Sequence, residues 1–307
     1  MTNKLPECVD LSAEVAEALH AAAPVVALES TIITHGMPFP ANAEMASKVE
    51  AVIRAEGAVP ATIAVIDGRL KIGLNANDLE GLARTKGAMK LSRADLAFAI
   101  GQGRTGGTTV AATMVSAALC GIKVFATGGI GGVHRGAQAT FDISADLDEF
   151  ALSPVIVVSA GAKAILDLEK TLEVLETKGV PVVTYGQDRL PAFWSAASHL
   201  VSPLRLDSAE EIAAFQKSRL SLGMSGGMLV ANPIPAAFDI PASEMADFIS
   251  KALESAKNNG VTGKAVTPFL LAKILELSEG RSLTANIALV ENNARLAARI
   301  AKALQIS

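Results

Sequence analysis

The chain has 307 residues, half of them hydrophobic, which is enough to bury one large α/β core or two smaller ones. Its net charge of -4 provides no overall basic field, so we expect no nucleic-acid partner. Residues 1–28 contain neither the apolar core of a signal peptide nor a run long enough to span a bilayer, which predicts a soluble, cytoplasmic protein with no membrane partner.

We expect residues 1–307 to form a single domain. No linker rich in Pro, Gly and Ser, no charge run and no internal repeat divides the sequence. Cys8 and Cys120 lie far apart, with no Cys or His beside them at metal-ligand spacing. They predict neither a disulfide framework nor a zinc site, and we interpret both as structural.

Short apolar runs alternate with amphipathic segments along the chain. The first, Pro24–Leu28, predicts a buried strand that ends at the polar residues Glu29-Ser30-Thr31. The turn Asp67-Gly68 joins two apolar runs and predicts a β-hairpin appended to the sheet. Further strands are predicted at residues 96–100, 123–126, 155–158, 180–184 and 228–231.

Helices are predicted between most of these strands. They cover residues 108–119, 162–178, 208–221 and 282–304, with one more beginning at Thr267-Pro268. This alternation predicts an α/β fold in which a mostly parallel, mixed sheet lies between layers of helices. In such sheets ligands bind beyond the carboxyl ends of the strands, where Glu29, the loops at 101–109 and 127–136, Lys163 and Asn232 are all expected.

Lys163 is the candidate nucleophile. It follows the strand at 155–158 and the segment Ser159-Ala160-Gly161-Ala162, at the expected start of a helix. A lysine is almost entirely protonated near neutral pH, so it needs burial or a nearby cation before it can attack a sugar aldehyde and form a Schiff base. The alternative is a lysine that opens a helix and points to solvent.

Glu29 is the candidate proton donor. It ends a buried strand, and burial of a carboxyl group favours its protonated form. The alternative is a carboxylate that caps a helix or a turn. Residues alone leave both interpretations open.

The glycine-rich segment from Gly101 favours an anion. Its glycines allow close backbone approach, and the helix expected after Thr109 and Val110 would present free N–H groups to a phosphate. The spacing matches neither a Walker motif nor a dinucleotide fingerprint, so the signal is weak. Lys90 could add a positive charge, or it could be an ordinary surface lysine.

Asp142 and Asp146 lie four residues apart in the sequence, with Ser144 between them. This pattern suits a hard, oxygen-ligated divalent cation that keeps several waters better than it suits zinc. The nearby His134 could contact a base or fill a hydrogen-bonded niche, and Asn286 is uninformative by itself.

Five blocks of sequence, taken together, resemble the pseudouridine-5'-phosphate glycosidase family. They are Ala27–Pro38, Thr127–His134, Phe141–Leu147, Ser159–Lys163 and Asn232–Pro235, and they extend over almost the whole chain in the family's order. The resemblance implies an indigoidine synthase A-like three-layer α/β/α fold and a homotrimer. It also implies reversible cleavage of the C–C glycosidic bond of pseudouridine 5'-phosphate to uracil and ribose 5-phosphate, with Mn²⁺ or another divalent cation.

The resemblance also implies roles for individual positions. Lys163 matches the Schiff-base lysine and Glu29 the proton donor, while Asp142 matches the metal ligand. The implied substrate contacts are Lys90 at the phosphate, His134 and Asn286 at the pyrimidine, and Thr109, Val110, Ser144, Ala145 and Asp146.

Two other functions use the same features. A Schiff-base aldolase acting on a phosphosugar also needs a lysine and a phosphate site, and it differs by releasing no uracil. A non-catalytic, nucleotide-binding regulator would bind in the same cleft, and borohydride would trap no sugar on it.

Overall fold

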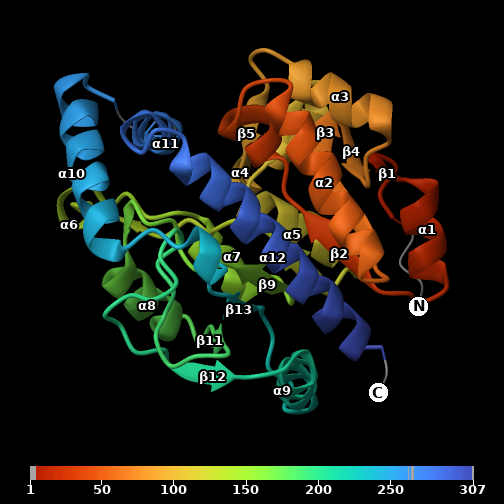
Figure 1. Cartoon of the computed structure of the whole chain (residues 1–307). Helices are drawn as coiled ribbons and strands as arrows, with labels where there is room; N and C mark the ends of the chain where they lie inside the picture. Colours follow the sequence, from red (N-terminus) through yellow and green to blue (C-terminus); the bar gives the residue numbers. More distant parts are fainter. Residues whose placement is uncertain (1–4, 262, 264–265, 306–307) are drawn as a thin grey trace.

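A mixed, mostly parallel β-sheet forms the centre of the protein (Figure 1). The structure is a computed structural model that describes residues 5–261, 263 and 266–305. The strands of the main sheet are β1 Val9–Leu11, β2 Val25–Leu28, β3 Val59–Ile66, β4 Arg69–Ile72, β5 Met89–Leu91, β6 Gly106–Thr108, β7 Val124–Ala126, β9 Ile156–Ser159, β11 Val182–Tyr185, β12 Leu204–Leu206 and β13 Met228–Ala231. β8, Val133–His134, and β10, Leu166–Asp167, pair separately.

The strand order is β1-β4-β3-β2-β7-β9-β13-β11-β12, with β6 paired to β3 and β5 paired to β6. From β3 through β2 to β12 every neighbouring pair is parallel. The predicted hairpin is present as β3 and β4, and β4 extends the sheet beyond β3. Asp67 and Gly68 in its turn have φ of 48° and 75°, which suits a glycine at the second position.

Helices cover both faces of the sheet (Figure 1). Their bounds are α1 Ala13–His20, α2 Ala41–Ala55, α3 Ala76–Arg84, α4 Arg93–Gly101, α5 Val110–Leu119, α6 Ala137–Thr140, α7 Asp146–Leu152, α8 Leu168–Thr177, α9 Ala209–Ser221, α10 Ala242–Asn258, α11 Val266–Leu277 and α12 Arg281–Ala303, with short η helices at Ile32–Gly36 and Ala236–Phe238. The long α12 packs on β2, β7, β9 and α2, whereas α5 packs on β2, β7, α4 and α7. None of the helices in the described ranges is long and apolar enough to cross a membrane.

Three predicted elements differ from the structure. Residues 96–100 form part of α4 and not a strand, because the capping box of Ser92 and Asp95 starts a helix that buries Leu96 and Ala99 but exposes Phe98. The helix predicted from residue 162 begins at Leu168. α11 already includes Val266, so Pro268 occupies its third position, still within the first turn that tolerates proline.

The segment before α8 is extended because it pairs with a distant part of the chain. Ala162 bridges to Ile130, and Leu166 in β10 pairs with His134 in β8. Asp167 then caps α8 by accepting a hydrogen bond from the Lys170 N–H at 3.1 Å. Lys163 therefore lies in a loop between β9 and β10 and not at a strand-to-helix junction.

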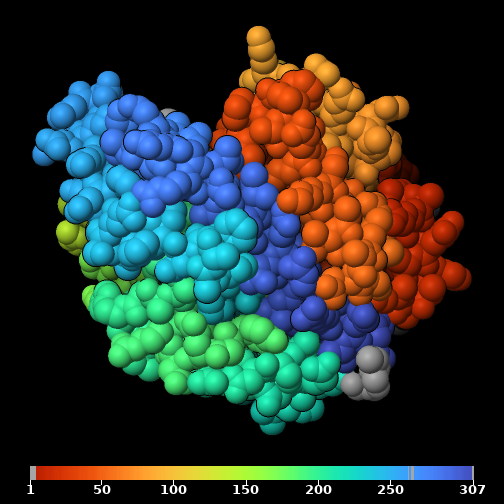
Figure 2. All heavy atoms as spheres, viewed as in Figure 1, coloured from red at the N-terminus to blue at the C-terminus, as the bar shows by residue number. Residues whose placement is uncertain are grey.

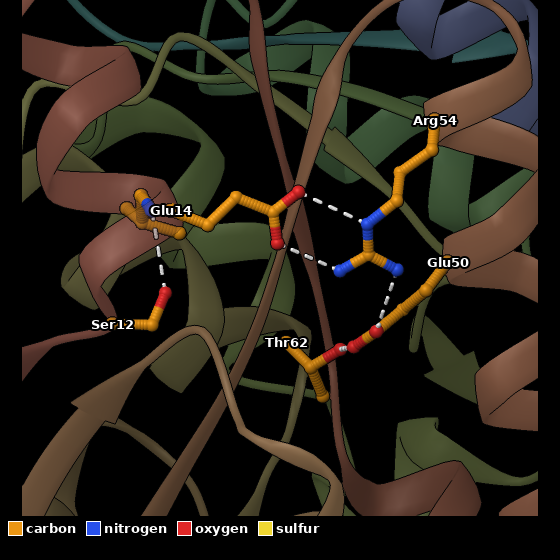
Figure 3. Close-up of polar contacts among 6 residues, drawn as sticks. Ser12, Glu14, Glu50, Arg54 and Thr62 are labelled. Carbon is orange, nitrogen blue, oxygen red and sulfur yellow. Dashed lines mark hydrogen bonds and ion pairs between the residues drawn. The ribbon is translucent and has the colours of Figure 1, made fainter.

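An ionic network fastens α1 to α2 and β3, with Glu14 and Arg54 exposed and Glu50 buried (Figure 3). The Arg54 guanidinium donates to both carboxylate oxygens of Glu14, at 3.0 and 2.8 Å, and to Glu50 at 3.2 Å. Glu50 also accepts from the Thr62 hydroxyl at 2.6 Å. The hydrogen bond from Arg54 lowers the pKa of Glu14 and raises that of Arg54.

Candidate active site

The predicted site residues follow neighbouring parallel strands. Leu28 of β2 pairs with Ala126 of β7, and Ala126 pairs with Val158 of β9, so Glu29 and Thr127 leave the sheet side by side. The chain continues this pairing beyond the strands. The Lys163 N–H donates to the Ile130 carbonyl at 3.1 Å, which places the lysine beside the glycine-rich run after β7.

A cavity of about 370 Å³ opens at this edge of the sheet. Glu29, Lys90, Lys163 and Asn286 all line it, so four of the predicted site residues share one space. Its remaining walls come from residues 31–38, Gly128-Gly129, Phe193, the α11 residues 267–275 and the α12 residues 282–290. In the space-filling view the surface is notched between α11 and the orange residues next to α2 (Figure 2).

Glu29 is almost fully buried and is held at both oxygens. The Thr31 hydroxyl donates to Oε2, and the Thr127 hydroxyl donates to Oε1. Hydroxyl groups rotate and can accept as well as donate, so the same contacts can hold the carboxyl group with or without a proton. These neighbours therefore fix the orientation of the Glu29 carboxyl group at the cavity wall. Glu29 does not cap the short helix Ile32–Gly36, which has no side-chain cap.

Lys163 is half-buried and lines the same cavity as Glu29. Its Nζ makes no hydrogen bond or ion pair with any residue in the described ranges. Burial lowers the pKa of the His134 ring, and the positive charges of Lys90 and Lys163 lower it further, although Asp142 opposes them. The positive charges of two lysines thus lower the pKa of the same imidazole.

The Lys90 end of the cavity is electropositive. Burial and the charge of Lys90 also lower the pKa of His35, which lines the cavity and lies 2.7 Å from the Thr34 hydroxyl through Nδ1. Cations that depress the pKa of neighbouring imidazoles favour an anionic ligand at the same place. A phosphate ester suits this end of the cavity.

The remaining predicted contacts form a cluster beside the cavity and do not line it. Asp146 is buried, and its carboxylate accepts from the Ala111 N–H at 2.9 Å and the Gly131 N–H at 2.8 Å. It therefore ties the glycine-rich run to the start of α5. The other members are Thr109, which caps α5, Val110, Ser144, which accepts from the Asp146 N–H, and Ala145, which precedes α7.

The two aspartates predicted to attract a cation have different surroundings in the structure. Both Asp146 oxygens are occupied by backbone N–H groups, whereas the Asp142 side chain is 44% exposed, with Oδ2 3.9 Å from His134 Nδ1. In the described ranges, no cluster of three or more His, Cys, Asp or Glu side chains could hold a metal. Asp142 could contribute one oxygen to a hard cation whose other ligands are water or substrate, which is how Mg²⁺-like ions are often held.

Several residues of the site were not predicted. Thr31, Thr127 and His35 lie inside the sequence blocks that carry the family resemblance, but nothing in their spacing indicates a contact with Glu29 or with the cavity. Phe193 and Trp194 lie in an irregular loop that has no motif.

Asn232 was expected in the cleft but is buried behind it. Its Nδ2 donates to Asn293 at 3.0 Å, and Asn293 donates to the Thr127 carbonyl at 2.9 Å. These two amides hold α12 against the loop that carries Thr127. Asn232 thus supports the site from outside it.

Known proteins match this chain over almost its whole length. The family model described as indigoidine synthase A like protein matches residues 14–303. A protein of Mesorhizobium japonicum named pseudouridine-5'-phosphate glycosidase is 68% identical over 296 residues, which cover 96% of this chain and 97% of the relative. The protein of the same name from Dinoroseobacter shibae is 65% identical and covers 98% of each chain.

Solved structures share the fold. The prealnumycin C-glycosynthase AlnA, crystallised in complex with ribulose 5-phosphate, superimposes with a TM-score of 0.91 at 38% identity and covers 98% of each chain. An indigoidine synthase A-like protein from Thermotoga maritima has a TM-score of 0.89 at 33% identity, over 99% of this chain and 100% of that one.

Proposed function

The chain belongs to the indigoidine synthase A-like protein family, and from this we propose that it is a pseudouridine-5'-phosphate glycosidase. In this proposal it cleaves pseudouridine 5'-phosphate reversibly to uracil and ribose 5-phosphate. The observation that carries the proposal is that Lys163 and the buried Glu29 line one cavity, with Lys90 beside them. The complex of the related C-glycosynthase with a phosphopentose supports a phosphosugar as the ligand.

Each residue has a chemical role in this proposal. Neutral Lys163 Nζ attacks C1' of the substrate, the C1'–O4' bond breaks, and a proton passes from the nitrogen to O4', so the ribose ring opens with C1' bonded to both the lysine and the base. As the C–C bond to the base breaks, the nitrogen lone pair becomes a C=N bond, the bonding electrons return to the uracil ring, and Glu29 supplies the proton that the uracil carbon takes up. Water then hydrolyses the Schiff base, which releases ribose 5-phosphate and restores the amine.

The residues that line the cavity suit each of these roles. Lys90 and His35 form its basic end, which suits the phosphate, and Phe193, Leu271 and Val290 contribute apolar surface that suits the flat base. Lys163 adjoins Gly128-Gly129, where the absence of side chains lets a ligand approach the backbone. This arrangement supports a binding mode in which the sugar carbon between phosphate and base lies at the lysine.

We further propose a divalent cation, Mn²⁺ or a similar ion, at Asp142. When bound, it would supply a fixed positive charge that neutralises substrate oxygens. We also propose a cytoplasmic homotrimer in the hydrolase or lyase class, following the family resemblance. Asp142→Ala should lose metal-dependent cleavage that excess manganese restores only in part, and full activity of wild type in chelator would contradict the role of the ion.

The central experiment mixes the pure protein with manganese and pseudouridine 5'-phosphate and measures free uracil. Separately, borohydride is added to the protein with ribose 5-phosphate, and the intact mass is measured. We expect uracil release and a single pentose-phosphate adduct on wild type, and neither on Lys163→Ala. Glu29→Gln should still trap the sugar, because it keeps the lysine, but should release uracil at least about 100-fold more slowly.

Lys170→Ala is the matched control. Lys170 lies on the neighbouring α8, is exposed and pairs with Asp167 at 2.5 Å, so its loss should change neither trapping nor cleavage. Trapping on wild type without uracil release would favour an aldolase, and unimpaired turnover by Lys163→Ala would refute the role of the lysine.

A further inference from the structure

Phe193 is held at the cavity wall in an unusual conformation. Its φ is 62°, in the left-handed region that a bulky residue rarely adopts, so its surroundings must hold it there. The Phe193 N–H donates to the Ala160 carbonyl at 3.0 Å, and the ring lies against Gly129, where a Cβ would come within 2.6 Å of it. This backbone conformation also fixes the direction of the next residue, Trp194.

Trp194 lies behind the cavity wall and contacts two residues that line the cavity, Phe193 and Asn286. It is 1% exposed, does not line the cavity, and packs edge-on against Phe193 with ring centroids 4.8 Å apart. Its indole Nε1–H donates to Asn286 Oδ1 at 2.7 Å and to the Ser282 carbonyl at 3.2 Å. Both acceptors belong to α12, so the indole joins the 193–194 loop to that helix.

The hydrogen bond from Trp194 determines which way the Asn286 amide points. An indole nitrogen can only donate, so the amide atom that faces it must be the oxygen. Asn286 lines the cavity, and its Nδ2 makes no hydrogen bond with any residue in the described part of the chain. Asn286 therefore offers N–H donors to a ligand.

We propose that Trp194 is a positioning residue that sets base specificity through Asn286. With Oδ1 engaged by the indole, the amide presents Nδ2 to a base, and this donor pairs with a carbonyl oxygen and not with an amino group. In this proposal Nδ2 faces ring position 4 of the base, so the site selects uracil, which has a keto oxygen at that position, over cytosine, which has an amino group there. This inference rests on the proposed function, which places a nucleobase at the apolar end of the cavity.

The test compares uracil and cytosine as inhibitors of pseudouridine 5'-phosphate cleavage, in wild type and two variants. Trp194→Phe keeps an aromatic ring beside Phe193 but removes the N–H, so the amide of Asn286 can rotate. One neutral hydrogen bond corresponds to roughly a 2- to 12-fold change in affinity, so the preference for uracil should fall by about that factor. KM for the substrate should rise by a similar factor, with a smaller change in kcat.

Asn286→Asp provides the second variant. Its carboxylate still accepts from Trp194, so the packing is kept, but it can no longer donate to a carbonyl oxygen. We expect its preference to shift toward cytosine, whose amino group donates. Because Trp194 is the only tryptophan of the chain, the change of its fluorescence on adding each base measures binding directly in wild type and in this variant.

The two possible failures are distinguishable. Ribose 5-phosphate carries no base, so borohydride trapping on Trp194→Phe should match wild type. If wild type traps the sugar and releases uracil but both variants keep its uracil-to-cytosine ratio, the role of Trp194 is wrong and the proposed function stands. If wild type neither traps the sugar nor releases uracil, both the role of Trp194 and the proposed function are wrong.

Discussion

Replacing Asp146 by alanine should destabilise the fold strongly even without ligand. The carboxylate is buried and accepts from the Ala111 and Gly131 N–H groups at 2.9 and 2.8 Å. Hydrogen bonds to a charged group contribute roughly 1.5–3 kcal/mol each, so losing both removes about 3–6 kcal/mol. Water that enters the vacated space can satisfy one N–H, so we expect a loss of about 3 kcal/mol, a large fraction of the stability of a typical domain.

Asp148→Ala is the control, because Asp148 lies on the same helix two residues later. Its side chain is 63% exposed and pairs with Lys178 at 2.6 Å, an exposed arrangement that contributes only about 0–1 kcal/mol. Urea titrations of ligand-free wild type and both variants, followed by far-ultraviolet circular dichroism, give the free energy of unfolding. A difference between the two variants below about 1 kcal/mol would refute the structural role assigned to Asp146.

Two further predictions concern packing and thiol reactivity. Gly129→Ala places a Cβ 2.6 Å from the Phe193 ring, so urea titration should show that the free energy of unfolding falls by roughly 1–3 kcal/mol. Gly81→Ala, in open space on α3, should instead raise the free energy of unfolding by about 0.5–1 kcal/mol, and equal values for the two variants would contradict this reasoning. Burial raises the pKa of the Cys120 thiol to about 11. The rate at which iodoacetamide alkylates Cys120 in native protein should therefore keep rising with pH up to about that value. A rate that levels off near pH 9, as expected for the protein unfolded in urea, would count against this prediction.

The sequence predicts the central strands well, for a physical reason. Strands such as β2 and β13 are buried along their whole length, so they read as unbroken apolar runs between polar residues. Residues 96–100 make an equally short apolar run inside α4, and periodicity cannot separate the two cases. The capping residues Ser92 and Asp95 were the local signal for a helix. The single domain stays a prediction.

The site is less predictable, because long-range contacts build it. The lysine and the glutamate could be singled out since each follows a buried strand. The extended segment after Lys163 depends on pairing between Leu166 and His134, which no local pattern reveals. The indole bond to Asn286 joins residues that lie 92 positions apart, so only the folded chain shows it.

The position of α12 near the end of the described residues affects how the protein folds during its synthesis. This helix covers β2, β7 and β9 and carries Asn286 and Asn293, yet it follows every strand of the main sheet in sequence. A ribosome therefore exposes the strands first, and their apolar surface stays uncovered until residues near 303 have emerged. A polypeptide interrupted before α12 would present that bare surface to other molecules, and it would aggregate instead of forming a smaller catalyst.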